Sequence, residues 1–425
     1  MIAFIKKLWR DRRGNALVIV AAAMPLVLGS AGLASDTIQW ALWKRELQRA
    51  ADSGAMAGVY AIVQDDGGRT NVAAAVDRDL LYNNHVNYTY TKVVGQPTSG
   101  TYASDVYAVQ VQVSVQQALG FSGMFLNYTP TITARGTATV VPSGKYCVIS
   151  LEEAAVTGID ATGSTDVNLG CGMITNSVSM TAAVATGSSS VAASPIAAVG
   201  GIPASTHWAA GTVLQPFTVA QLDPFASVPL PTPSGCTAFP NNQPHDVVSI
   251  ANPTGVKCFN TTMDIKGAVT LAPGTYIMDA GAGVGTTNTG GSLSCTGCTI
   301  ILMNSSGGSV GTVDLQGGTI NMTAPSTGCT LGASGCTDGM LFYQSRNAAA
   351  DNSIRINGNS GSVLEGALYF PKADITFNGD SGMSANCLQI VAKDVTFTGN
   401  SSITNTCPSG GASHSFDGKK VRLVA

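Results

Sequence analysis

An uncharged apolar run from Ala16 to Ala34 limits what the amino-terminal part of this chain can form. As a helix, the run would be about 28 Å long, enough to cross the ~30 Å hydrocarbon layer of a membrane. Five cations precede it (Lys6, Lys7, Arg10, Arg12 and Arg13). Because such cations are retained in the cytoplasm, we expect a cytoplasmic tip over residues 1–14, a membrane span over 15–35 and export of everything after Asp36.

The helical pattern continues beyond the span, over residues 36–64. Apolar or small residues recur there at alternating spacings of three and four, which is typical of a seam between two helices. Toward the carboxyl end the seam narrows to alanine and glycine, which allow a second backbone to approach closely. We therefore predict a helix-docking seam made of Trp40, Trp43, Leu47, Ala50, Gly54, Ala57 and Ala61.

The same stretch carries a family resemblance. Arg13-Gly14-Asn15-Ala16, the segment from Gly32 to Asp36 and the run LQRAADSGA at residues 47–55 resemble the amino-terminal segment of TadG-like proteins of the Flp (Tad) pilus-assembly family. The resemblance covers about residues 10–65. It implies a structural or scaffolding component of the bacterial inner membrane. Its expected partners are pilus-assembly or pseudopilin-like proteins, or a second copy of the chain, bound through the amino-terminal helix.

Processing of the amino terminus is open on the sequence alone. Pseudopilin relatives are cut after a glycine by a peptidase that favours glutamate five residues on, whereas Gly14 is followed there by Ile19. This difference favours an uncut, anchored form. A signal-peptide cleavage near Gly32-Leu33-Ala34 is the alternative, although the apolar run is longer than usual for a signal peptide.

Composition and the positions of the cysteines limit the fold and the partners expected for the exported part. Only 11% of residues are charged and 49 are glycine, which favours turn-rich β structure. The net charge of -3, with no basic patch beyond the tip, argues against nucleic acid as a partner. All ten cysteines follow the span, which predicts a disulfide framework of open connectivity in an oxidising compartment. They are Cys147, Cys171, Cys236, Cys258, Cys295, Cys298, Cys329, Cys336, Cys387 and Cys407.

Residues 65–142 are expected to form a small α+β module. Residues 70–82 have the pattern of a short amphipathic helix, and apolar residues alternate with polar ones in predicted strands at 86–94, 106–115 and 131–141. Pro142-Ser143-Gly144 marks the predicted boundary of the next domain.

A repeat in the carboxyl third predicts a right-handed parallel β-helix over residues 143–407. Pentapeptides of the form apolar, polar, apolar, polar, Gly occur at residues 313–317, 354–358, 375–379 and 395–399. Their starts lie 41, 21 and 20 residues apart, so one coil is about 20 residues and the first gap is expected to span two coils. The proline-rich stretch 202–253 is expected to be a surface loop, which a bridge between Cys236 and Cys258 could hold in place. Residues 408–425 are a predicted tail that caps the coils or remains mobile.

Catalytic residues are not evident. Asp374 and Asp394 are expected to stack on neighbouring coils, but no arginine or histidine completes a lyase-type site, so solvated strand-end residues are the favoured interpretation. Asp314 is another repeat position, and Glu365 either points inward or marks a turn. Cys295-Thr-Gly-Cys298 lacks the strand-to-helix context of a redox motif, and the histidines are too scattered for a metal site. Many TadG-like proteins end in a von Willebrand A domain with Asp-x-Ser-x-Ser, which this chain lacks.

The sequence therefore predicts a non-enzymatic scaffold with no catalytic, cofactor-binding or metal-binding residue. The alternative is a surface adhesin or a carbohydrate-active β-helix enzyme. A cleft with converging carboxylates would favour that alternative.

Overall fold

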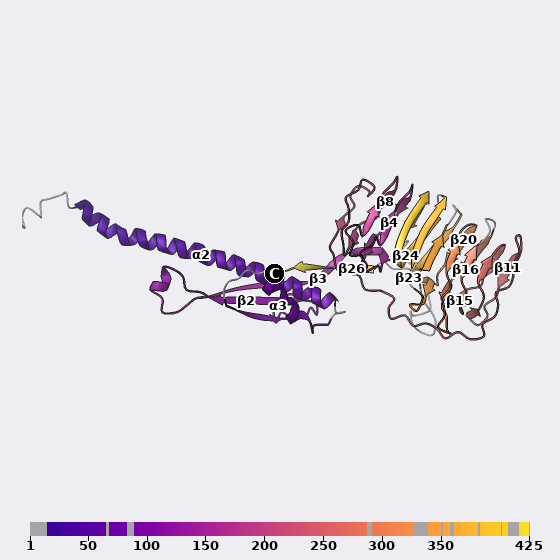
Figure 1. Ribbon diagram of the computed structural model, residues 1–425, viewed down its shortest axis with the longest axis horizontal. Helices are drawn as coiled ribbons and strands as arrows, with labels where there is room; N and C mark the ends of the chain where they lie inside the picture. The colour runs from indigo at the N-terminus through magenta and orange to yellow at the C-terminus, as the bar shows by residue number, and fades with distance from the viewer. Residues whose placement is uncertain are drawn as a thin grey trace, which may run out of the picture. The chain divides into compact units, whose positions relative to one another are not determined.

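Figure 1 shows the computed structural model of the chain, which describes residues 15–64, 68–82, 89–286, 291–325, 339–349, 352–357, 361–380, 383–400, 402–406 and 416–424. Strands make up 42% and helices 17%, which confirms the prediction of a mainly β chain with one long amino-terminal helix. The chain divides into unit 1, residues 1–141 and 421–425, and unit 2, residues 142–420. The predicted cytoplasmic tip, residues 1–14, lies outside the described residues.

Unit 1 is built on helix α2 (Asn15–Gln64), which runs without a break through the predicted span and the predicted seam. From Val18 onward it is apolar and long enough to cross a membrane, and it is the one such helix in the described part of the chain. Large apolar side chains from Val18 to Leu42 are exposed. Pro25 lies inside the helix. Proline has no backbone N–H to donate, and membrane-spanning helices tolerate this loss of a hydrogen bond.

The carboxyl half of α2 packs on a small antiparallel sheet. Strand β1 (Tyr90–Gly95) pairs with β2 (Val109–Gln116), and β2 pairs with the first part of β3 (Thr131–Ser150). The alternating valines of β2, from Val109 to Val115, are buried, whereas the polar residues between them are partly exposed. Helix α3 (Val72–Tyr82) also packs on α2 with its apolar side. Each buried valine contributes about 1.5–3 kcal/mol, so this core holds α2 against the sheet.

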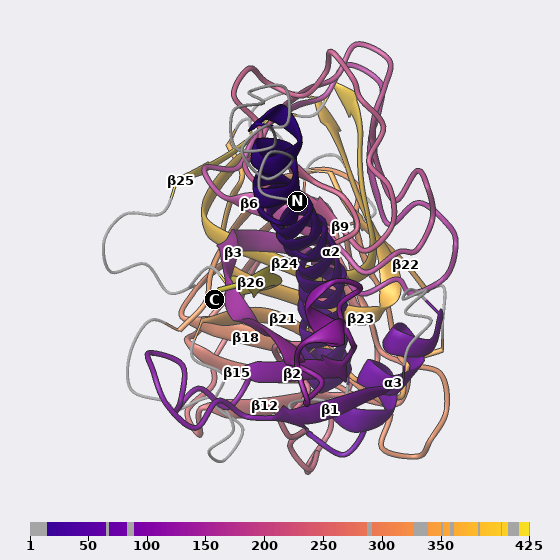
Figure 2. The same cartoon turned by 90° about the vertical axis from the view of Figure 1, so that its left-hand side faces the viewer.

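Unit 2 is a β-helix-like stack in which three parallel ladders, A, B and C, run along three sides of successive coils. In spatial order, ladder A contains β10 (Leu214–Gln215), β9 (Ile196–Ala198), β6 (Gly172–Thr175), β3, β24 (Met383–Asn400), β23 (Val363–Asp380), β21 (Met340–Gln344), β18 (Cys298–Leu302), β15 (Gly274–Met278) and β12 (Val256–Phe259). Figure 2 shows β12, β15, β18 and β21 one above another.

Ladders B and C follow the same spatial order. Ladder B contains β7 (Ala183–Ala185), β4 (Ile159–Ala161), β24, β23, β22 (Asn352–Ile356), β19 (Val313–Leu315), β16 (Val284–Thr286) and β13 (Met263–Ile265). Ladder C contains β8 (Ser190–Ala192), β5 (Asp166–Asn168), β25 (Ser402–Thr406), β24, β23, β20 (Thr319–Thr323), β17 (Ser292–Thr296), β14 (Ala268–Leu271) and β11 (Val247–Ile250).

The predicted repeats stack on one another in ladder B. Ile354 lies beside Ile375, which lies beside Val395, and the rings of Phe377 and Phe397 stack with centroids 5.5 Å apart. The prediction that the first gap of 41 residues spans two coils is wrong, because β19 pairs directly with β22. That coil instead carries a long connection between β20 and β21, and part of it, residues 326–338, lies outside the described residues.

The coils do not follow one another in the order of the sequence. The last coil pairs with the first: Ile390 lies beside Val148, Val395 beside Ile159 and Ile403 beside Val167. In Figure 1 the magenta and pink strands β4 and β8 accordingly lie next to the yellow strand β24. From β3 the chain builds coils outward to β10, crosses to the far end of the stack at β11 and β12, and builds back until β24 meets β3.

The crossing segment, residues 216–246, is here called the strap. It passes along the outer side of ladder A, where Phe225 and Val228 cover a second apolar core that includes Tyr343 and Tyr369. The predicted insertion 202–253 was too long, because Leu214–Gln215 already pairs in ladder A and Val247–Ile250 belongs to ladder C. Both strands lie outside the proline-dense part of the segment, whose prolines lack the N–H group that a ladder needs.

The carboxyl terminus forms a strand rather than only a tail. Contacts of Asp417 and Val424 with β3 place strand β26 (Phe416–Leu423) antiparallel to it. In unit 2 Lys145 Nζ lies 2.9 Å from Asp417 Oδ1, and in unit 1 the Val424 amide donates a hydrogen bond to the Thr137 carbonyl. The chain therefore passes between the two units twice, in β3 and in β26.

Candidate functional site

The predicted seam on α2 is divided between the protein's own core and its surface. Leu47, Ala50, Gly54 and Ala61 are buried, Trp43 and Ala57 are partly exposed, and Trp40 is exposed. A Cβ added at Gly54 would lie 3.3 Å from a methyl group of Val76 in α3 and 3.5 Å from one of Val111 in β2. This burial corrects the prediction of one docking surface, since the small residues admit the chain's own sheet and α3.

The cysteines form the predicted kind of framework wherever the structure describes them. Disulfides join Cys147 to Cys171, Cys236 to Cys258 and Cys295 to Cys298, and Cys387 is also disulfide-bonded. No described cysteine is free. Cys295 and Cys298 are buried, so this pair is not accessible for redox exchange with another protein. Cys329, Cys336 and Cys407 lie outside the described residues.

A cleft of about 610 Å³ opens in unit 2 where strands of ladder A end beside the strap. It combines carboxylates, cations and amides in one place. Its lining residues are Leu151, Glu152, Glu153, Asn176, Ala220, Gln221, Leu222, Asp223, Arg346, Pro371, Lys372 and Lys393. The cleft therefore joins residues of the first two coils, the last three coils and the strap, which are far apart in the sequence.

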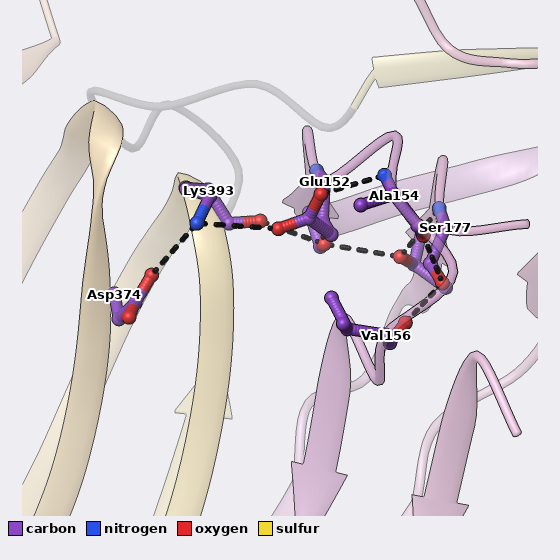
Figure 3. Close-up of polar contacts among 8 residues, drawn as sticks. Glu152, Ala154, Val156, Ser177, Asp374 and Lys393 are labelled. Carbon is purple, nitrogen blue, oxygen red and sulfur yellow. Dashed lines mark hydrogen bonds and ion pairs between the residues drawn. The ribbon is translucent and has the colours of Figure 1, made fainter. Parts of the chain in front are cut away.

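Lys393 connects the first coil to the last at one wall of this cleft. Its Nζ lies 3.3 Å from Glu152 Oε2 and 4.0 Å from Asp374 Oδ1, as Figure 3 shows. Glu152 is buried, and its other oxygen accepts a hydrogen bond of 2.7 Å from the Ala154 amide. The Lys393 carbonyl accepts hydrogen bonds from the Glu152 amide and the Ser150 hydroxyl. A buried carboxylate with a charged partner is costly to separate from it, so these contacts hold the two coils together.

Asp374 and Asp394 lie directly beside each other in register on neighbouring coils, which confirms their predicted stacking. Burial, followed by the charges of Asp374 and Glu152, raises the pKa of Asp394 to about 7, although Lys393 acts in the opposite direction. Asp394 is not among the residues that line the cleft. The carboxyl with the pKa best suited to proton transfer near neutral pH thus lies apart from the space that a substrate would occupy.

The opposite wall of the cleft fixes the strap. The Tyr369 hydroxyl donates a hydrogen bond of 2.7 Å to Asp223 Oδ2, and Arg346 Nε lies 3.6 Å from the same oxygen. The Arg346 guanidinium carbon lies 5.4 Å from the centre of the Tyr369 ring, and its Nη1 donates to the Val228 carbonyl. Charge pairing and cation–π contact both hold Asp223 and Val228 of the strap on ladder A.

The positions of two further acidic residues, Glu365 and Asp314, follow from the strands that contain them. Glu365 is partly exposed between the buried Leu364 and Gly366, which has a positive φ of 122°, so it lies before a corner of the coil and does not point inward. Asp314 lies 3.4 Å from Arg355 Nε on the next coil. Among the described residues, no group of three histidine, cysteine, aspartate or glutamate side chains has the arrangement of a metal site.

Comparisons with known proteins add no relative. No family model, curated protein or solved structure matches the chain. The resemblance to TadG-like proteins therefore rests on residues 10–65 alone.

The sequence did not point to Glu152, Lys393, Asp223 or Arg346. Their meeting depends on the pairing of β3 with β24 and on the path of the strap, and neither has a local sequence signal. One weak signal is present, since Leu151-Glu152 and Ala392-Lys393 each place a charged residue directly after an apolar strand.

The raised pKa of Asp394 leads to a prediction about pH. Because the folded state binds this proton more tightly than the unfolded state, stability falls as pH rises from about 4 to about 7. Asp394→Asn removes the buried charge, so we expect a melting temperature about 2–4 °C above that of the parent at pH 8 and little difference at pH 4. Calorimetry of the full chain in detergent measures both. Asp166→Asn, at an exposed position of β5, is the control. A gain for Asp394→Asn that is equal at both pH values would contradict the prediction.

Proposed function

We propose that this protein is a single-pass scaffold of an Flp (Tad)-type pilus-assembly system in the bacterial inner membrane. Helix α2 crosses the membrane with the amino terminus in the cytoplasm. Unit 1 is a small α+β module next to the membrane. Unit 2, as a right-handed parallel β-helix, stands in the periplasm or at the cell surface. Pilus-assembly or pseudopilin-like proteins, or a second copy, are its partners, and its role is structural rather than catalytic.

The observation that carries this proposal is the continuity of α2. One helix contains an exposed apolar part from Val18 to Leu42 and a part that is packed into the core of unit 1. Because the membrane anchor is also a core helix of a folded module, it holds that module at a fixed position relative to the membrane. A scaffold requires such a fixed position. The disulfides of unit 2 support an oxidising compartment. The resemblance of residues 10–65 supplies the pilus system.

Deleting the gene in a piliated bacterium tests the proposal. We expect Flp-type fibres to disappear in electron micrographs and to return with the full chain. They should not return with a chain in which Lys and Glu replace Val20 and Leu28 of the span. Normal fibre numbers in the deletion strain would refute the role in pilus assembly.

The cleft in unit 2 favours one alternative, a surface adhesin or carbohydrate-active enzyme. Carboxylates and cations converge there on a space of about 610 Å³. Glycan arrays and reducing-sugar assays on the detergent-solubilised full chain test this alternative, with Arg346→Ala as the variant. Glycan binding or cleavage that Arg346→Ala abolishes would favour it, and its absence would favour the scaffold.

A further inference from the structure

The loop between β2 and β3, residues 117–130, exposes apolar side chains that no described residue of unit 1 covers. It contains no charged residue. The exposed fractions are 79% for Met124, 71% for Phe125 and 68% for Tyr128, and Leu126 is also exposed. Side chains of this size and chemistry cost free energy when they face water, and together they form a contiguous segment of the loop.

Two residues of α2 fix the position of this loop. The Asp36 carboxylate accepts a hydrogen bond of 2.9 Å from the Phe121 amide and one of 2.5 Å from the Ser122 amide. Asp36 is buried by these contacts although its neighbours on α2 are exposed. One turn earlier, at Gly32, an added Cβ would lie 2.3 Å from the Phe121 ring. Gly32 and Asp36 lie on the same face of the helix, so both hold the loop against it.

These contacts place the loop at the end of the apolar span. Gly32 belongs to the uncharged run, and Asp36 is the first charged residue after it. The Phe125 ring lies 5.2 Å from the Phe121 ring, centre to centre, so the exposed tip stays near that level. On α2 itself Ile38, Trp40 and Leu42 are exposed just beyond Asp36. In Figure 1 α2 extends past the ends of β2 and β3, with the connecting loop beside it.

We propose that residues 121–128 insert into the boundary between headgroups and hydrocarbon of the membrane that α2 crosses, on its exported side. The proposal rests on the membrane anchoring proposed above. Aromatic side chains that also carry a polar atom favour this boundary, and Tyr128 and Trp40 provide them. The lack of charge and the position beside the emerging helix favour lipid over a protein partner. Because unit 1 then contacts the membrane at two points, its sheet has a fixed orientation to the bilayer.

Photolabelling from the lipid tests the proposal. The full chain is reconstituted into vesicles of phosphatidylethanolamine and phosphatidylglycerol that contain a phospholipid with a diazirine near its glycerol, and labelled peptides are mapped by mass spectrometry. We expect label on α2 and on residues 121–128. The connection between β1 and β2, residues 96–108, lies at the opposite end of β2 and should remain unlabelled.

The variant Asp36→Ala tests whether Asp36 holds residues 121–128 at the membrane or whether these residues reach the lipid without it. Without the carboxylate the loop is released, so its label should fall at least about fivefold while label on residues 18–33 is unchanged. Thr37→Ala, which alters an exposed neighbour, should leave both unchanged. Label on α2 with none on the loop would overturn this proposal and leave the anchor intact. No label on α2 would overturn the anchor as well. Equal loop label in Asp36→Ala would refute the positioning role of Asp36.

Discussion

Gly136→Ala is expected to lower the stability of unit 1 by about 1–3 kcal/mol, the usual effect of overpacking a close contact. Gly136 lies in β3 directly beneath α2. An added Cβ would lie 2.6 Å from the carbonyl carbon and oxygen of Ala51 and 2.7 Å from the Asp52 amide nitrogen. These are backbone atoms of a helix, which cannot move aside as a flexible side chain can. Limited proteolysis and thermal unfolding of the full chain in detergent measure the loss.

Gly95→Ala is the matched control for this prediction. Gly95 ends β1 in the same sheet, and a Cβ added there would meet nothing within 4 Å. We therefore expect its melting curve and its protease resistance to match those of the parent chain. If Gly136→Ala were as stable as Gly95→Ala, the close packing of α2 on β3 described here would be incorrect.

Removal of the bridge between Cys236 and Cys258 is expected to destabilise unit 2 strongly. The two residues lie 22 apart in the sequence, and closing a loop of that length restricts the unfolded chain by about 3 kcal/mol. The bridge also joins the strap to β12, at the far end of ladder A. Chemical denaturation of a variant with alanine at both positions should therefore show a lower midpoint. Proteolysis should cut the strap first.

The bridge between Cys295 and Cys298 provides the comparison. Its residues are only 3 apart, so the same reasoning gives about half the loss. Replacing both of these cysteines with alanine should leave the strap resistant to protease. An equal or larger loss from this pair would indicate that the strap contributes little to the stability of unit 2.

The strap explains why the fold can have its first and last coils side by side. A chain that builds coils in one direction from β3 and then fills the other side needs a connection along the whole stack. Residues 216–246 supply it, held by Asp223, Val228 and Cys236. Because β24 pairs with β3, the last coil of the sequence lies beside the first and joins the two parts of the stack.

Local patterns predicted the local structure of this chain. The apolar run predicted α2, and the alternating valines predicted β2. A strand with one buried face shows apolar residues at every second position of the sequence. The 20-residue spacing gave the stacking of Asp374 on Asp394. A period does not reveal what covers a face. For that reason the pattern around Gly54 predicts a partner helix, although Val76 and Val111 of the same chain cover this residue.

Contacts between distant segments could not be predicted in the same way. The pairing of Val148 with Ile390 and the ion pair of Glu152 with Lys393 join positions separated by most of unit 2. Judged from the sequence alone, any two apolar strands of similar length could pair with each other in a ladder. The order of the coils therefore leaves no local signal in the sequence. The walls of the cleft depend on that order.

Thiol labelling on the two sides of the membrane is the most direct test of whether α2 is a single membrane span. Cysteine substitutions are made at Ala3, in the tip, and at Ser99, exposed in the connection between β1 and β2, and a membrane-impermeant thiol reagent is added to cells whose outer membrane has been removed. If α2 crosses the membrane with its amino terminus in the cytoplasm, Ser99→Cys reacts at once and Ala3→Cys reacts only after detergent is added. Reaction of Ala3→Cys without detergent, or protection of Ser99→Cys, would contradict a single span with unit 2 outside the cytoplasm.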